Sequence, residues 1–407
     1  MSADKKVPDI RFKGFSGEWG EKELNNEVEF FSGLTYSPSD VRKTGTLVLR
    51  SSNVKNGQLL QVDNVYVNPE VVNCSNVIKG DVIVVVRNGS KSLIGKHALV
   101  TSYMDNTVIG AFMTGIRSKQ SKFINALLDT NKFNAEVEKN LGATINQITT
   151  GSFKRMRFAF PTDIEQTTIG NYFQKLDNLI NQHQQKHDKL SNIKKAMLEK
   201  MFPKPGETVP EIRLKGFSGS WLNNPIGQIC GSTFGGGTPS TSEKSFWQGN
   251  IPWIQSSDIA DGDVSSVNAK KYITKVAVNK STTKLISGNS IAIVTRVGVG
   301  KLSLMKDRFT TSQDFLSLSD LKVDAQFSAY AIWKQLQIEK EQVQGTSIKG
   351  ITKEELLSKI ITFPKSKLEQ TAIGNYFQKL DTLIEQHQQQ ITKLNNIKQA
   401  CLSKMFI

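Results

Sequence analysis

The sequence predicts a mixed α/β (α+β) protein in which two globular domains are joined by two long helices that pair antiparallel as a coiled coil. Three observations support this fold class. The chain repeats itself, each repeat ends in a long heptad pattern without proline, and short apolar runs typical of strands lie between. The expected segments are a globular domain at 1–160, a central helix at 161–205, a second globular domain at 206–363 and a C-terminal helix at 364–407.

Two stretches of the chain establish the internal duplication. Residues 7–19 recur as residues 209–221, with ten of 13 positions identical at an offset of 202. Residues 165–202 recur as residues 369–406, with 28 of 38 positions identical at an offset of 204. Offsets so nearly equal indicate two whole units arranged head to tail, related by pseudo-two-fold symmetry. Residues 20–160 and 222–362 share only short landmarks, so the two domains share a scaffold but not their surfaces.

The repeated C-terminal stretch of each unit is predicted to be one long helix. Residues 163–201 contain no proline and place apolar side chains at heptad spacing, and Pro161, Pro203 and Pro364 lie at the expected helix boundaries. A helix of about 39 residues is roughly 58 Å long and cannot bury its apolar stripe alone, so its duplicate is the simplest partner. The expected pairing residues are Ile169, Phe173, Leu176, Ile180 and Leu190 in the first helix, and Ile373, Phe377, Leu380, Ile384 and Leu394 in the second.

A histidine pair in the middle of the first helix has two interpretations. His183 and His187 are four residues apart on one helix face, a spacing that can hold a metal ion. The second copy keeps His387 but has Ile391 at the other position. The pattern therefore favours a polar layer that sets the register of the helices, and we expect no metal site.

The regions between the repeated stretches are predicted to hold strands at 47–49, 81–86 and 290–295 and helices at 122–139 and 325–341. The formal net charge is +15, and the helical segments 163–205 and 364–407 carry only +2 and +3 of it, which leaves +10 for the rest. An excess of this size suggests a polyanionic partner, most commonly nucleic acid. Diffuse solubilising charge is the alternative.

Matching positions after a probable strand carry different polar side chains in the two domains. The first domain has Arg50 and Asn53 where the second has Gln255 and Asp258. In the major groove arginine favours guanine, asparagine and glutamine favour adenine, and aspartate accepts from cytosine. Such a difference on a common frame is what two domains reading different sequences would show. Buried structural pairing is an equally good interpretation of any single arginine.

The polar loops that follow the predicted strands are expected to contact DNA. A glycine-rich loop at 235–237 would let the backbone approach a phosphate closely. A plain flexible turn explains the same glycines equally well. In the first domain the expected contacts are Thr35, Tyr36, Arg50, Ser51, Ser52, Asn53, Arg87, Asn88 and Lys91. In the second they are Gly236, Gly237, Thr238, Gln255, Ser256, Ser257, Asp258, Thr295, Arg296 and Lys301.

Signatures of catalysis, membranes and secretion are missing from the sequence. Only four histidines occur and three lie on the predicted helices, which argues against a Ser–His–Asp catalytic triad or a Cys–His catalytic dyad. The segment 298–301 lacks the spacing of a phosphate-binding loop. No apolar run approaches the roughly 20 residues of a membrane span, and the N-terminus has no signal-like apolar region. Three widely separated cysteines fit a reducing compartment, so we expect a non-catalytic chain in the cytoplasm.

The sequence resembles the specificity subunits of bacterial type I restriction–modification enzymes. The resemblance is carried by the repeated openings at 8–19 and 210–221, by Gly-Gly-Thr-Pro-Ser at 236–240 with Ile-Pro-Trp-Ile at 251–254, and by the twin segments starting at Glu165 and Glu369. The first domain departs from it, with Ser-Gly-Leu-Thr-Tyr-Ser-Pro at 32–38 in place of the glycine-rich loop.

That resemblance implies two target-recognition domains, each reading one half of a split double-stranded DNA site, with the paired helices setting the spacer. It also implies two methyltransferase (modification) subunits and restriction (translocase) subunits as partners. S-adenosylmethionine, ATP and Mg²⁺ would belong to those partners, and this chain would hold no cofactor. The alternative function is a non-catalytic coiled-coil scaffold whose α/β domains bind protein partners, and an enzyme acting alone comes third.

Overall fold

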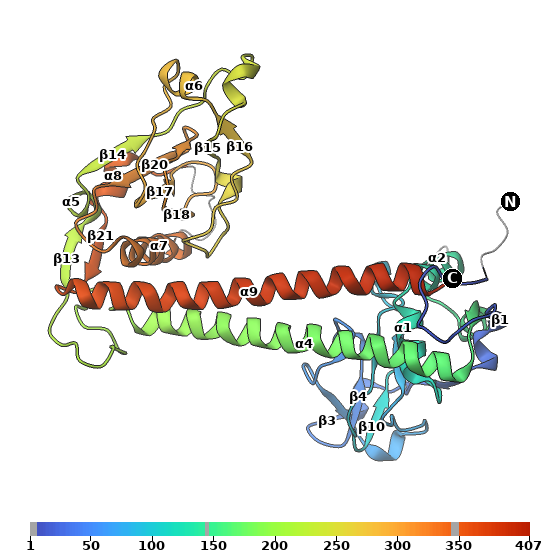
Figure 1. The fold of residues 1–407 in the computed structure, drawn as a ribbon. Helices are drawn as coiled ribbons and strands as arrows, with labels where there is room; N and C mark the ends of the chain where they lie inside the picture. The colour runs from blue at the N-terminus through green and yellow to red at the C-terminus, as the bar shows by residue number, and fades with distance from the viewer. Residues whose placement is uncertain (1–5, 143–145, 343–349) are drawn as a thin grey trace. The chain divides into compact units, whose positions relative to one another are not determined.

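The computed structural model describes residues 6–142, 146–342 and 350–407 (Figure 1). The chain forms two compact units, the first made of Met1–His183 with Gln389–Ile407 and the second of Gln184–Gln388. Each unit therefore contains one globular domain and a half of each long helix. The sequence predicted each long helix as a segment separate from the globular domains. In the structure, half of each helix belongs to each unit and completes the core of its domain.

Two four-stranded sheets form the first domain within its described residues. One has the order β2 (Glu29–Ser32), β11 (Met113–Arg117), β8 (Val82–Val85) and β9 (His97–Leu99), with antiparallel neighbours. The other has the order β10 (Thr107–Ile109), β4 (Thr46–Leu49), β7 (Val65–Val67) and β3 (Val41–Arg42), and β10 runs parallel to β4. Two short pairs join β1 (Gly20–Glu23) to β12 (Arg157–Phe160) and β5 (Val54–Lys55) to β6 (Gln58–Leu59). All four β8 side chains are buried, which explains its continuous apolar sequence and confirms the strand predicted there.

The helix expected at 122–139 is two helices, so that prediction was wrong. α1 (Ser121–Leu128) ends before Asp129, and α2 (Asn131–Asn140) begins after Thr130. Thr130 Oγ1 accepts a hydrogen bond from the Phe133 backbone N–H at 3.2 Å and so caps the second helix, a local preference that periodicity does not reveal. A third helix, α3 (Thr150–Arg155), precedes β12.

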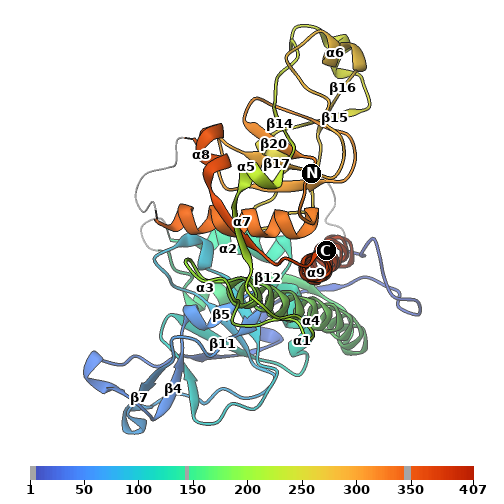
Figure 2. The same ribbon diagram turned by 90° about the vertical axis from the view of Figure 1, so that its left-hand side faces the viewer.

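The second domain repeats this framework. Its larger sheet has the order β14 (Ser232–Gly235), β20 (Phe315–Ser319), β17 (Ser290–Val294) and β18 (Leu302–Met305). A smaller sheet has the order β16 (Lys271–Ile273), β15 (Ile251–Ile254) and β19 (Thr310–Thr311), and β13 (Leu222–Pro225) pairs with β21 (Ile360–Phe363). The helices are α5 (Ile226–Ile229), α6 (Lys275–Asn279), α7 (Ala325–Gln342) and α8 (Lys353–Ser358), and α7 confirms the helix predicted at 325–341. In this unit α7 lies beside α9, while β15, β16 and α6 lie at the far end of the domain (Figures 1 and 2).

The long helices α4 (Asp163–Lys200) and α9 (Lys367–Met405) agree with the predicted ranges. In the first unit the Asp177 carboxylate lies 2.6 Å from Lys398 Nζ, and the Tyr172 hydroxyl lies 3.4 Å from Cys401 Sγ. In the second unit Lys194 forms an ion pair with Asp381. Residue numbers rise along one helix as they fall along the other, so within each unit the paired segments are antiparallel, as expected.

The predicted pairing residues have two environments. The first three of each helix are buried inside a domain core, where the end of the other helix joins them. These buried residues are Ile169, Phe173 and Leu176 in the first core and Ile373, Phe377 and Leu380 in the second. The remaining four, Ile180, Leu190, Ile384 and Leu394, are partly exposed. The apolar stripe therefore anchors the helix ends to the domains as much as it pairs the helices.

The repeated openings bind the helix ends in the same way in both units. Arg11 forms two 2.6 Å hydrogen bonds with the buried Glu165 at the start of α4. Arg213 forms two 2.8 Å hydrogen bonds with the buried Glu369 at the start of α9. The Ile10 N–H donates to the carbonyl of Lys404 near the end of α9 at 3.0 Å. In the second unit the Ile212 N–H donates to the carbonyl of Lys200 at the end of α4, at 2.8 Å. The sequence duplication is thus also a duplication of ion pairs.

Candidate nucleic-acid interface

Loops from several strands meet at one edge of the first domain, which we call the first edge and define as residues 33–36, 50–53, 86–91 and 110–112. β8 ends where the antiparallel β11 begins, with Val85 opposite Met113. β4 and β10 are parallel and end together at Leu49 and Ile109. Leu34 then bridges to Gly110, which brings the loop after β2 to the same place. The strand order therefore collects most of the predicted contact loops.

Specific contacts hold the first edge together. Asn88 Nδ2 donates to Ser51 Oγ at 3.0 Å and so joins the loops after β8 and β4. The Arg87 guanidinium lies 4.9 Å from the centre of the Phe112 ring, and both side chains are exposed. Arg50 donates to the carbonyl of Asp63 at 2.6 Å, which holds its guanidinium on the domain. The edge combines positive charge, hydrogen-bonding groups and an exposed aromatic ring.

The second domain has an equivalent edge, the second edge, at residues 235–238, 255–258, 295–301 and 312–315. The Ser312 N–H donates to the carbonyl of Ile254 at 2.9 Å, and the Thr295 N–H donates to that of Asp314 at 2.7 Å. An open hollow of about 880 Å³ lies here, large enough to admit the edge of a base pair or a phosphate group. Its lining includes Gly236, Thr295, Arg296, Val297, Gln313 and Lys353.

Two of the predicted base contacts are structural, and those predictions were wrong. Asn53 is fully buried, and its amide donates to the carbonyls of Leu60 and Val62 at 3.0 and 2.8 Å. Its Oδ1 accepts from the Arg50 N–H, just as Asp258 Oδ2 accepts from the Gln255 N–H. Asp258 is only 4% exposed. Each of the two side chains closes the same short 3₁₀ turn, so the landmark shared by the domains reflects a common loop fold.

The glycine-rich loop is closely packed inside the domain. A Cβ at Gly236 would lie 1.9 Å from the carbonyl oxygen of Ser312, and one at Gly237 would lie 2.5 Å from Thr282 Oγ1. Gly237 is itself buried. Thr295 is buried too, and its hydroxyl donates to the carbonyl of Asp314 at 3.1 Å. The predictions that Gly237 and Thr295 contact DNA are corrected accordingly. Gly236 is partly exposed and lines the hollow, so its contact with DNA stays a prediction.

The other predicted contacts lie at the surface of the two edges. Thr35, Ser52, Arg87, Lys91, Thr238, Ser257 and Arg296 are exposed, and Tyr36, Arg50, Ser51, Asn88, Gln255, Ser256 and Lys301 are partly exposed. Their contact with DNA stays a prediction. Sequence reasoning missed Phe112, which lies directly before β11, and Gln313, which lies two residues before β20. Only the strand pairing could have found them, because residues that precede a strand reach the same edge as residues that follow its antiparallel neighbour.

Buried ion pairs connect each domain to the long helices. In the first unit Lys398 Nζ lies 2.6 Å from both Asp129 and Asp177. Burial lowers the pKa of Lys398, but the two carboxylates outweigh burial and the pKa is raised. These interactions join α9 to α4 and to the first domain. The charged residues were not among the predicted pairing residues.

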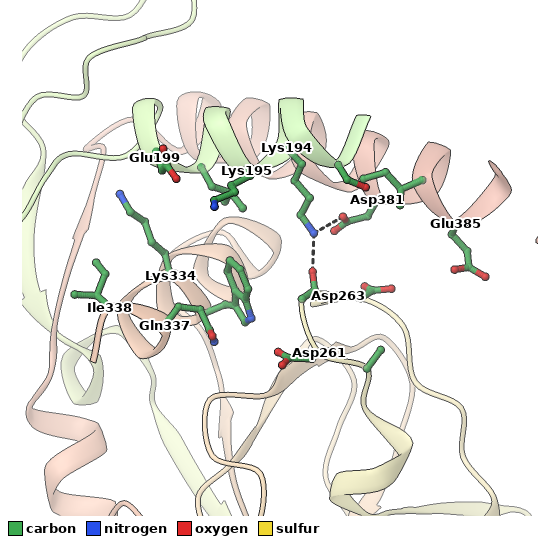
Figure 3. A pocket seen from close by; sticks show the side chains of 16 residues that line it. Lys194, Lys195, Glu199, Asp261, Asp263, Lys334, Gln337, Ile338, Asp381 and Glu385 are labelled. Atoms are coloured by element: carbon green, nitrogen blue, oxygen red, sulfur yellow. Dashed lines mark hydrogen bonds and ion pairs between the residues drawn. The ribbon is translucent and has the colours of Figure 1, made fainter. Parts of the chain in front are cut away.

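In the second unit Lys194 occupies the equivalent position, at the offset of 204 that relates the two long helices. It pairs with Asp381 and donates to the carbonyl of Gly262 at 2.6 Å (Figure 3). Burial raises the pKa of the Asp381 carboxyl, against the effect of Lys194. The Tyr330 hydroxyl also donates to Asp381, at 2.7 Å. A cleft of about 650 Å³ lies between α4, α7, α9 and the loop at 260–263 of this unit.

The part of the chain that the structure describes has neither a metal-binding cluster nor a membrane-spanning helix. No group of three or more His, Cys, Asp or Glu side chains is placed there to hold a metal ion. His187 Nδ1 lies 3.0 Å from the carboxylate of the adjacent Asp188. Across the described ranges, no helix has both the length and the apolar character needed to cross a bilayer.

Comparison with known families decides which class of protein this is. The family described as the type I restriction modification DNA specificity domain matches the chain twice, over residues 16–192 and 219–396. The chain belongs to this family. The resemblance stated from the sequence is confirmed, and the two matches coincide with the two repeats.

Individual proteins are similar in sequence to parts of this chain. The MjaIX specificity subunit of Methanocaldococcus jannaschii is 28% identical over 186 residues, which are 44% of this chain and 42% of that protein. The EcoR124I/EcoR124II specificity subunit of Escherichia coli is 48% identical over 75 residues, 18% of each chain. The matched regions thus span less than half the length of these relatives.

A solved structure of the DNA specificity family extends the likeness of fold to the whole chain. The S subunit of a type I restriction–modification system from M. genitalium has a TM-score of 0.70, with 13% identity over 98% of this chain and 99% of that one. At this identity the match concerns the fold alone. It supports the mixed α/β class with two repeated domains and two long helices.

Proposed function

We propose that this chain selects the DNA site of a type I restriction–modification complex, in which each domain reads one half of a bipartite, asymmetric site. The observation that carries the proposal is the pair of equivalent edges. Both domains place loops at the same end of the same strand framework, yet the exposed side chains there differ between the domains. The repeated helices, by contrast, are nearly identical. Membership of the DNA specificity family supports this division between two variable DNA-reading domains and two nearly identical long helices.

The charge distribution favours DNA as the partner of the two edges. Arg87 and Arg296 are exposed at matching positions, each two residues beyond the end of its strand, β8 or β17. The net charge of +15 lies mostly outside the long helices. Arginine and lysine at such edges neutralise phosphates and supply donors to base edges. In this proposal the paired helices hold the two readers apart and so set the length of the unspecific spacer.

The outer faces of the long helices are the proposed docking sites for two methyltransferase subunits. Exposed residues at heptad-like spacing are identical in the two copies, although solvent places no demand on their identity. They are Asn171, Lys175, Gln182, Gln185, Lys189 and Asn192 in α4, and Asn375, Lys379, Gln386, Gln389, Lys393 and Asn396 in α9. A single kind of partner bound twice explains this identity. Restriction subunits would join through the same complex.

The chemistry of modification and cleavage belongs to the partners in this proposal. S-adenosylmethionine, ATP and Mg²⁺ would be bound by the methyltransferase and restriction subunits, and this chain would act without a cofactor of its own. A cytoplasmic location follows, because the host DNA to be modified lies there.

Domain exchange tests the proposed function. Residues 20–160 are replaced by the corresponding domain of a relative, and the chain is combined with its methyltransferase subunits. Mapping of methylated sites on genomic DNA should show one half-site changed and the other retained. A change in both halves would contradict independent readers. Failure of the unaltered complex to bind duplex DNA would favour the scaffold whose domains bind proteins.

A further inference from the structure

We infer that Gln313 in the second domain and Phe112 in the first domain decide which bases the two edges accept. The inference rests on the proposed function and names residues within the proposed reading edges. Neither residue belongs to the glycine-rich loop or to the landmark turns that the sequence singles out.

The strand register places these residues beside equivalent arginines. Val85 pairs with Met113 across β8 and β11, and Val294 pairs with Phe315 across β17 and β20. Counting two residues beyond β8's Val85 and β17's Val294 gives Arg87 and Arg296. Phe112 directly precedes β11, and in this register it matches Asp314, which directly precedes β20. Gln313 lies one residue further from β20 and lines the same hollow as Arg296, so the two edges place residues of different type near the arginine. The arginine is therefore common to both readers, and its neighbour is what distinguishes them.

A hydrogen bond orients the Gln313 side chain. Thr238 Oγ1 donates to Gln313 Oε1 at 2.5 Å, which is at the short end of the range for a hydroxyl donor on an oxygen acceptor. The carbonyl end of the amide is thus engaged, and within the described residues the Nε2 donors have no hydrogen-bond partner. Gln313 and Arg296 line the same hollow. Two donor side chains consequently line one hollow.

Donors at this position select among bases by simple complementarity. Guanine, adenine and thymine each present an acceptor in the major groove, whereas cytosine presents only its N4 amino donor. An outward-facing amide N–H group therefore accepts the first three bases and rejects cytosine. The second half-site should exclude cytosine at one position.

Phe112 gives the first edge a different preference. Its ring is 52% exposed and has no hydrogen-bonding group. The ring lies 4.9 Å below the Arg87 guanidinium, so it restricts where that arginine can point. An apolar ring at a base edge favours the methyl group of thymine. The first half-site should therefore show a thymine preference next to the base that Arg87 contacts.

Substitution of Gln313 tests the inference. Each variant is assembled with methyltransferase subunits, and the bases that the complex selects are measured with a DNA library randomised over the site. Gln313→Glu keeps the size of the side chain but replaces its donors with acceptors, so cytosine should become accepted at one position of the second half-site. Gln313→Ala should reduce discrimination at that position by at least about fivefold. The first half-site should be unchanged in both variants. Phe112→Ala should alter the first half-site alone.

Two controls separate the possible outcomes. Thr238→Val removes the orienting hydroxyl with little change in shape and should relax the same position as Gln313→Ala. Gln248→Ala changes an exposed glutamine away from the second edge and should leave the site unchanged. If the Gln313 variants bind and methylate the original site without change, the inference is overturned while the proposed function stands. If the unaltered complex selects no DNA site, the proposed function itself fails.

Discussion

At the scale of single residues, the two repeats are held by the same buried arginine–carboxylate contact. Arg11 binds Glu165 and Arg213 binds Glu369, and the two glutamates are 1% and 2% exposed. Each arginine also donates to two backbone carbonyls of its own segment, to Gly17 and Ser16 in the first unit. The contact therefore ties the start of a long helix to the turn-rich opening segment of the same unit.

Removal of one of these arginines should destabilise its unit. Arg213→Ala leaves Glu369 buried without its partner, which typically costs about 3 kcal/mol. Denaturant unfolding, followed by a probe in the second domain, should show the loss. Lys200→Ala is the matched control, since the pair of Lys200 with Glu211 is exposed and should contribute little. Equal losses from both variants would show that burial of Glu369 is not what matters.

At the scale of elements, the paired helices are proposed to set the spacing of the two edges. Their outward positions repeat between the copies, while the changes between copies include Lys186, Lys195 and Glu199. The helices thus have two predicted roles, one in spacing the readers and one in docking partners. Each role can be disturbed separately.

Insertion of one heptad into each helix should lengthen the spacer of the DNA site. Seven residues add about 10.5 Å, which corresponds to roughly three base pairs at 3.4 Å each. A whole heptad keeps the apolar stripe in phase, and the polar stretch near His183 and His387 tolerates it best. Methylation-site mapping measures the spacer. An unchanged spacer in a folded variant would show that the helices do not set it.

Charge reversal on the repeated outer face should weaken partner docking. The double variant Lys175→Glu with Lys379→Glu changes one exposed position in both copies, so capture of methyltransferase subunits should fall at least about tenfold. Lys186→Glu with Lys195→Glu makes the same change in net charge at exposed positions that are not repeated, and should bind normally. Equal loss in both variants would point to charge alone rather than to a docking face.

At the scale of the whole molecule, the charge of +15 should make DNA binding strongly dependent on salt. Lysine and arginine contacts to phosphates release counterions, so affinity falls as salt rises. Between 50 and 200 mM salt we expect a loss of at least about tenfold for the complex on its site, measured by fluorescence anisotropy. An affinity that stays flat over this range would remove nucleic acid as the partner of the two edges.

The sequence by itself determined the duplication and the long helices of this protein. Self-comparison revealed the repeat, and heptad spacing without proline over 163–201 predicted a helix that the structure contains. Both are local signals, because periodicity is a property of neighbouring residues along one element. The antiparallel pairing followed from the need of a long apolar stripe for a partner.

Only the tertiary structure decided which polar residues face outward. Asn53 and Asp258 lie in loops with base-reading chemistry, yet their side chains close buried turns. Phe112 and Gln313 precede strands far along the chain and reach the edges only through antiparallel pairing. The physical reason is that a polar side chain can satisfy its hydrogen bonds either with the backbone or with a ligand. The sequence of one loop does not record which neighbours the fold brings to it.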